Sequence, residues 1–195
     1  MKQLAALVLL AGSVFGQTTI RYWAGEHEKS VLADWAMQAW AEGSSGLLRI
    51  QKVDTADEAE IRFRWVNPQR RGLYGQSYTT NRDGKRISEV VINPSIESLG
   101  PDMSGAVAKD PLYGEVVLFL TCVHEAGHAL GPAHTREFAD IMYSFEFGGD
   151  FVAYFQRYRI KLKSRADIQR FTPLASGDIR QIKDLMSRNK QNEKR

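Results

Sequence analysis

Three of the four histidines in the chain lie in one short segment, HEAGHALGPAH, which runs from His124 to His134. The first two, His124 and His128, are four positions apart, and apolar residues recur at helical spacing before and between them. Four residues of an α-helix turn through about 400°, so both imidazoles leave one face of the helix, one turn apart. Two neutral imidazole nitrogens placed in this way can bind one divalent ion such as zinc.

A third ligand can come from the residues that follow this helix. Gly131 can adopt the positive φ angle that ends a helix and reverses the chain, and Pro132 does not continue a helix. His134, three residues after Gly131, can therefore return to the same ion. Three protein ligands leave the fourth position of a zinc ion open to water, as in catalytic zinc sites. The sequence thus predicts one catalytic zinc ion bound by His124, His128 and His134.

Glu125 directly follows the first of these ligands and lies about 100° further around the helix. From this position the Glu125 carboxylate is poorly placed to bind the same ion, but it can reach a water molecule that is bound to the ion. From there the carboxylate can take a proton from that water and pass it to a leaving amine. The segment therefore predicts hydrolysis of a peptide bond, with Glu125 as the general base.

The histidine segment fits the pattern HExxHxxGxxH, and Met142 follows eight residues after His134 in the sequence ADIMYS. Here the chain resembles the metzincin metalloproteases, and within them the matrixin-like branch, in which a turn containing methionine supports the zinc ligands. Residues 174–186, LASGDIRQIKDLM, are similar to the closing helix of matrixin catalytic domains. The resemblance implies an α+β fold with a twisted, mixed five-stranded sheet, three main helices and a cleft that holds a catalytic zinc.

The resemblance also implies one catalytic domain over residues 17–195, with an upper part at 17–131 and a lower part at 132–195. It assigns the zinc to His124, His128 and His134 and catalysis to Glu125, with Gly131 and Met142 as structural support. Tyr143 directly follows the methionine, and we do not expect it to bind the metal. Matrixins carry a second, structural zinc with further histidine ligands. Because no histidine lies between His27 and His124, we expect no second zinc, while calcium binding stays open.

The first sixteen residues have the pattern of a secretory signal peptide. Lys2 supplies the positive start, residues 4–11 are apolar, and Val14 and Gly16 are small residues before an expected cleavage site at Gln17. The apolar run is shorter than the roughly 20 residues that span a bilayer. We therefore expect an exported protein, secreted or periplasmic, whose mature chain begins at Gln17.

The composition is ordinary for a globular protein, with 43% hydrophobic and 25% charged residues. The formal net charge is only +3, and no nucleic-acid-binding motif accompanies it, so we do not expect nucleic acid as a partner. We expect a monomer that binds a peptide or protein substrate and whose mature chain does not insert stably into membranes. The single cysteine, Cys122, lies about 200° around the predicted helix from His124, which indicates a core residue.

Hydrophobic periodicity and turn residues predict the elements that position this site. Strands are predicted at residues 18–24, 47–53, 59–66, 73–80 and 87–93, and the last two form a hairpin with a turn at Asp83–Gly84. Helices are predicted at about 27–42, 113–130 and 176–187, with Ser176 as the N-cap of the last, a loop at 94–111 and a frayed tail from Asn189. The resemblance places the strand at 73–80 on the exposed sheet edge, either to pair with an extended peptide or as a plain edge strand.

Residues 151–171 carry six basic side chains among aromatic ones. One interpretation is an amphipathic helix that contacts an anionic surface. The interpretation we favour is a solvated helix that flanks the core, because charged helix faces are usually hydrated. In the matrixin resemblance, the stretch of residues 145–171 is longer than the family's loop, which walls the main specificity pocket, so substrate preference is not carried over.

The leading hypothesis from the sequence is an exported zinc endopeptidase. The alternative is a secreted binding or adhesion module on the same fold, although such a module has no chemical need for Glu125. A zinc hydrolase that acts on a non-peptide amide, or on one partner protein, is a further alternative that the basic and aromatic segment leaves open.

Overall fold

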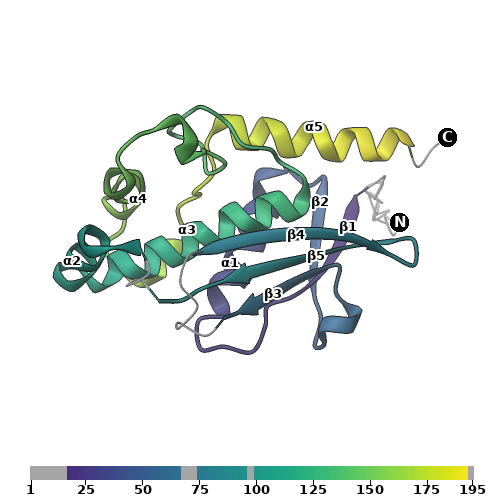
Figure 1. Cartoon of the computed structure of the whole chain (residues 1–195). Coiled ribbons are helices and arrows are strands. Elements are labelled where there is room, and N and C mark those ends of the chain that lie inside the picture. Colours follow the sequence, from purple (N-terminus) through teal and green to yellow (C-terminus); the bar gives the residue numbers. More distant parts are fainter. Residues whose placement is uncertain (1–16, 67–73, 96–98, 193–195) are drawn as a thin grey trace, which may run out of the picture.

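The structure, a computed structural model, describes residues 17–66, 74–95 and 99–192. The predicted signal peptide and Leu73, the first residue of the fourth predicted strand, lie outside the described residues. Five strands form one sheet in the order β2-β1-β3-β5-β4 (Figure 1). Their bounds are β1 Thr18–Trp23, β2 Leu48–Lys52, β3 Ile61–Trp65, β4 Gly75–Arg82 and β5 Lys85–Ile92. Because β4 runs antiparallel to β5 while the other neighbours are parallel, the predicted mixed five-stranded sheet is confirmed.

The sheet has one apolar face and one polar face, as the alternation of side chains along a strand requires. In β3, Ile61 and Phe63 are buried in the core. Arg62 and Arg64 alternate with them and pair with Glu89 of β5 at 3.5 and 2.8 Å. Only the apolar face therefore needs helices to cover it.

Helices α1 (Val31–Gly43) and α3 (Pro111–Leu130) contact each other and the sheet, and α3 also contacts β4 and β5. The fully buried Trp40 of α1 donates its indole N–H to the Val123 carbonyl of α3 at 2.8 Å. Cys122 is a free, fully buried core residue of α3, as expected. Helix α3, the most apolar of the described helices, thus lies between the sheet and the rest of the core. Among the described residues, no helix is long and apolar enough to cross a membrane.

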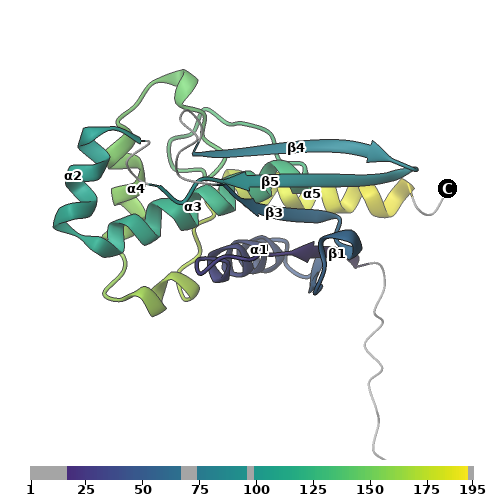
Figure 2. The ribbon, with the colours of Figure 1, turned by 60° about the horizontal axis from the view of Figure 1, so that its bottom comes forward.

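The hairpin of β4 and β5 closes with the predicted turn. Asp83 and Gly84 have φ angles of 52° and 74°, which is the pair of positive angles that a two-residue type I′ turn needs. Figure 2 shows β4 at the edge of the sheet, with β5 between it and β3. The expected edge position of this strand is therefore present in the structure.

Two helices differ from the predicted boundaries. Helix α1 begins at Val31 rather than at His27, because the His27 ring stacks on Trp65 at 4.9 Å and accepts the Lys29 N–H at 3.1 Å, which forms a turn. Helix α5 (Ser176–Asn192) continues past Ser187 and into the tail that was predicted to be frayed from Asn189. The tail residues are polar but contain no glycine or proline, so nothing in their chemistry ends the helix.

Residues 94–111 were expected to form a loop, but they contain helix α2 (Pro101–Lys109). Pro101 lies in its first turn, where the missing N–H costs nothing, and Met103 is buried. The loop was predicted because glycines and prolines are scattered through this segment, and they are typical of loops.

Residues 151–171 form two elements, helix α4 (Phe151–Arg159) and the 3-10 turn η4 (Arg165–Gln169). Three of the basic side chains contact residues outside this segment. Arg157 donates to the Asp140 carbonyl at 3.2 Å, Arg159 pairs with Asp110 at 2.7 Å, and Arg165 pairs with Glu115 at 3.1 Å. Such contacts favour the interpretation of a segment that flanks the core.

Candidate metal centre

The three histidines of the HExxHxxGxxH segment converge on one point. His124 and His128 lie one turn apart on α3, and His134 returns to them after the helix ends. The Nε2 atom of His134 is 3.0 Å from Nε2 of His128 and 3.3 Å from Nε2 of His124. One ring nitrogen of each residue lies within 4.8 Å of the others, a spacing that fits one bound ion. An all-imidazole donor set of this size suits zinc.

The reversal of the chain after α3 depends on Gly131, as predicted. Its φ angle is 121°, and its N–H donates to the Gly127 carbonyl at 2.9 Å, which closes the helix. The loop that follows is held by Gln181 of α5. The Gln181 side chain accepts the Ala133 N–H at 2.9 Å and donates to the Ala133 carbonyl at 3.1 Å. Gln181, which fixes the backbone next to His134, was not predicted from the sequence.

The protonation of the buried histidines suits a metal ligand. His124 Nδ1 lies 2.7 Å from the Ile141 carbonyl, which only accepts, so Nδ1 carries the hydrogen and Nε2 keeps its lone pair. The pKa of His124 is lowered to about 4, mainly by burial and in smaller part by the nearby His128 and His134. Burial is also the main cause that lowers the pKa of His128. Both rings are therefore neutral near pH 7, which leaves nitrogens free to bind a metal.

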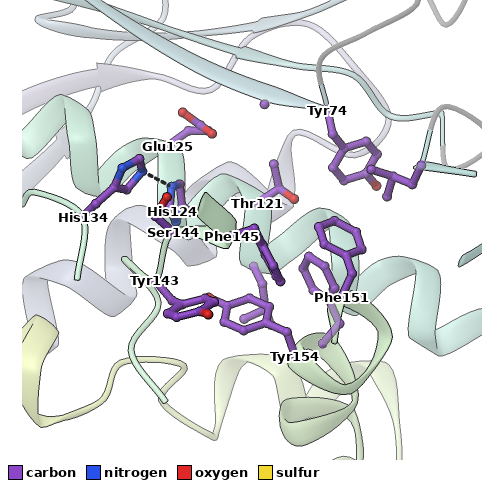
Figure 3. A pocket seen from close by; sticks show the side chains of 14 residues that line it. Tyr74, Thr121, His124, Glu125, His134, Tyr143, Ser144, Phe145, Phe151 and Tyr154 are labelled. Carbon is purple, nitrogen blue, oxygen red and sulfur yellow. Dashed lines mark hydrogen bonds between the residues drawn. The ribbon is translucent and has the colours of Figure 1, made fainter. Parts of the chain in front are cut away.

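Glu125 lies beside this cluster with 8% of its surface exposed. Burial raises the pKa of its carboxyl group to about 7. Figure 3 shows its side chain near His124 and His134, at the wall of the same cavity. The structure thus brings the predicted base and the predicted ligands together.

Met142 lies in a turn that packs under α3. Its side chain is fully buried, and its sulfur is so close to Gly127 that a side chain at position 127 would collide with it. Asp178 of α5 holds the backbone of this turn, accepting the N–H of Ile141 at 2.8 Å and of Met142 at 3.1 Å. Because the Ile141 carbonyl accepts the His124 ring hydrogen, Asp178 supports a ligand through one intervening residue.

Ser176 is not the N-cap that the sequence predicted, and the Asp178 side chain instead binds the backbone just before α5. Its carboxylate accepts the Ala175 N–H at 2.8 Å, while Ser176 is already the first residue of α5. Helix α4 adds further support, because the Tyr154 hydroxyl donates to the carbonyls of Asp140 and Ile141 at 3.1 and 3.0 Å. The methionine turn is therefore fixed from two later helices.

We expect Asp178→Ala to lower the free energy of unfolding by about 3–5 kcal/mol, because it leaves three buried or half-buried backbone N–H groups without their charged acceptor. Urea unfolding measures the change. The control is Asp184→Ala, an exposed carboxylate on the same helix, which we expect to change the stability by less than about 0.5 kcal/mol. Equal stability losses in the two variants would contradict the proposed role of Asp178.

A cavity of about 330 Å³ opens beside the metal cluster and is lined by His124, Glu125 and His134. Most of its remaining wall is aromatic and consists of Phe155 together with five residues labelled in Figure 3: Tyr74, Tyr143, Phe145, Phe151 and Tyr154. The Tyr143 hydroxyl donates to the Gly148 carbonyl at 2.7 Å, so it is engaged away from the metal cluster. The Phe145 ring lies 4.6 Å from Phe151 and 5.1 Å from Tyr154, which makes this wall a packed aromatic surface.

No protein-family model matches the chain, and no curated protein matches it. Among solved structures, the chain is similar to archaemetzincin from Methanopyrus kandleri, with 14% sequence identity and a TM-score of 0.44. The alignment covers 93% of this chain and 99% of that one. At this distance the likeness assigns no function, and the chemistry follows from the three histidines and the glutamate beside them.

Proposed function

We propose that this chain is an exported zinc endopeptidase of the metzincin type, of the matrixin-like branch. The observation that supports it is the convergence of three imidazoles next to a buried carboxylate, on the wall of a cavity large enough for a side chain. A binding module has no chemical use for a carboxylate at that position. The hydrolytic function therefore explains more of the site than the alternatives do.

His124, His128 and His134 would hold the zinc ion, and the neutral rings of His124 and His128 fit that role. Zinc in such a site acidifies a water molecule and polarises a carbonyl group. Glu125 accepts the proton of the attacking water and returns it to the nitrogen of the leaving amine. A carboxyl group whose pKa is near 7 can do both at neutral pH.

The edge strand β4 gives an extended substrate a place to bind. Tyr74 and Gly75, at the start of this strand, line the cavity together with Glu125. A peptide that added itself to the edge would satisfy its backbone hydrogen bonds along β4 and pass the metal cluster. This geometry favours a peptide or protein substrate over a small amide.

The aromatic wall predicts which substrate side chain enters the cavity. Among the described residues that line the cavity, Glu125 is the one carboxylate and none is Asp, Lys or Arg, and the volume of about 330 Å³ admits a large side chain. We therefore propose a preference for a large apolar or aromatic residue next to the cleaved bond.

Phe145→Ala is expected to reduce this preference, because it removes a ring that contacts Phe151 and Tyr154 in the wall. The ratio of kcat/KM for an aromatic over an alanine residue at that substrate position should fall by about 10-fold or more. Matched peptides that differ only at this position provide the measurement. The control is Phe147→Ala, whose ring is 48% exposed and lies outside the cavity lining. If Phe145→Ala had the same ratio of kcat/KM values as the parent, the assignment of the pocket would be contradicted.

Digestion of a peptide library by residues 17–195, read by mass spectrometry, tests the proposed function. We expect cleavage that a chelator stops and added zinc restores. Tight peptide binding without cleavage would favour the binding module instead. Hydrolysis of a non-peptide amide, or of one protein alone, would favour the dedicated hydrolase.

Export is part of the proposal and has its own test. The mass of the protein recovered from the producing cells' medium or periplasm should correspond to a chain that begins at Gln17. Full-length protein confined to the cytoplasm would contradict export without affecting the proposed chemistry.

A further inference from the structure

Gly75 brings the edge strand unusually close to the catalytic face of α3. A Cβ atom built on this glycine would lie 2.6 Å from Thr121 Cγ2, 2.8 Å from Glu125 Cγ and 2.9 Å from Glu125 Oε1. Real Cβ atoms essentially never have contacts shorter than 3.0 Å. Any side chain at position 75 would therefore displace the strand, Thr121 or the carboxylate of Glu125.

The backbone conformation does not explain this glycine. Seven described glycines have positive φ angles, and Gly75 is not one of them. Its backbone is that of an ordinary strand residue paired with Ile92 of β5, a conformation open to other amino acids. Glycine is thus required at position 75 because α3 leaves no space there for a side chain.

The two side chains under Gly75 have little freedom to move. Thr121 and Glu125 lie one turn apart on α3, with only 9% and 8% of their surfaces exposed. The Thr121 hydroxyl donates to the Val117 carbonyl at 2.9 Å, which fixes the rotamer. Glu125 could yield to a new methyl group only by moving its carboxylate within the cavity that it lines.

The register of the hairpin directs the backbone N–H and C=O groups of Gly75 away from β5. The Asn93 N–H donates to the Tyr74 carbonyl at 2.9 Å, so the backbone groups of Tyr74 face β5. Successive residues of a strand direct their N–H and C=O groups to opposite sides, so those of Gly75 face the open edge. A peptide paired with Gly75 would lie directly beside Glu125.

We propose that Gly75 is a positioning residue for the hydrolytic reaction. Its missing side chain lets the edge strand approach the Glu125 carboxylate and keeps that carboxylate beside the bound peptide. The proposal rests on the proposed function, because it presumes that Glu125 acts as the base.

Gly75→Ala tests it first through activity. We expect kcat to fall by about 10- to 100-fold, the scale of a displaced catalytic group, with the zinc content unchanged. The control is Gly105→Ala in α2, where a built Cβ meets nothing within 4 Å, and which should keep the parental kcat. A parental kcat in Gly75→Ala would overturn the proposal.

A double-mutant cycle with Glu125→Ala then tests the contact without relying on activity. Gly75→Ala should lower the Tm of the parent by roughly 2 to 10 °C and lower the Tm of the Glu125→Ala chain by less, because that chain lacks Cγ and Oε1. If Gly75→Ala lowered the Tm of the parent and of the Glu125→Ala chain equally, the proposal would be overturned.

Thr121→Ser supplies the third comparison, since it removes only the methyl group under Gly75. Activity fully restored by Thr121→Ser in the Gly75→Ala chain would show that Thr121 packing alone is affected, and would overturn a role through Glu125. A parent that hydrolyses nothing would instead contradict the proposed function, whereas the Tm cycle would still measure the contact.

Discussion

Glu125→Ala is expected to lower kcat by about two to four orders of magnitude while the chain keeps its zinc, because general acid–base catalysis contributes on that scale. The carboxylate is buried beside the metal cluster and lines the cavity, and it is not one of the three converging ligands. Its removal therefore takes away the proton acceptor and leaves the ligand set intact.

The measurement combines steady-state kinetics on a cleavable peptide with the zinc content of the same preparation. Glu58→Ala is a suitable control, since this glutamate is exposed in the η1 turn (Ala56–Glu58) and should leave both values unchanged. A Glu125→Ala chain that cleaves as fast as the parent would contradict the role of the carboxylate. Loss of zinc together with activity would show that Glu125 holds the ligand set instead.

His134→Ala is expected to weaken zinc binding by more than about 100-fold, beyond the effect of losing a residue that only supports a ligand, and to abolish activity. His134 lies in the exposed loop after α3, and the core of α3 does not depend on its ring. The metal-free variant should therefore fold as the metal-free parent does.

Competition titration with a zinc-binding dye measures the affinity, and circular dichroism compares the folds. His27→Ala is the matched control, because His27 is the one histidine outside the cluster and stacks on Trp65. It should bind zinc as the parent does. Undiminished zinc affinity in His134→Ala would mean that the three imidazoles do not act together.

The metal cluster could be predicted because the residues that form it lie close together in the sequence. His124 and His128 share one helical face, and Gly131 reverses the chain within the next few residues, so spacing alone brings His134 back. The β4–β5 hairpin was predictable for the same reason, through the Asp83–Gly84 turn. Periodicity also predicted the five strands, whereas their assembly into one mixed sheet followed from the family resemblance.

Gly131 and Met142 were predicted as supports of the site, but the further supports could not be predicted, because they depend on contacts between distant parts of the chain. Asp178 bonds to backbone 36 and 37 residues away, and Gln181 bonds to Ala133 across 48 residues. A carboxylate in the first turn of a helix is also favoured by the helix dipole alone. The local sequence does not distinguish that role from the binding of distant backbone N–H groups. Gly75 is similar, since its importance appears only when β4 lies against α3.

The most direct test of the central claim is a crystal structure of the zinc-loaded chain, with the metal located by its anomalous scattering at the zinc absorption edge. We expect one zinc ion bound by nitrogen atoms of His124, His128 and His134, at about 2.0–2.1 Å, with solvent as the remaining ligand. A fourth protein side chain on the metal, or a zinc ion bound elsewhere while these rings stay empty, would contradict it.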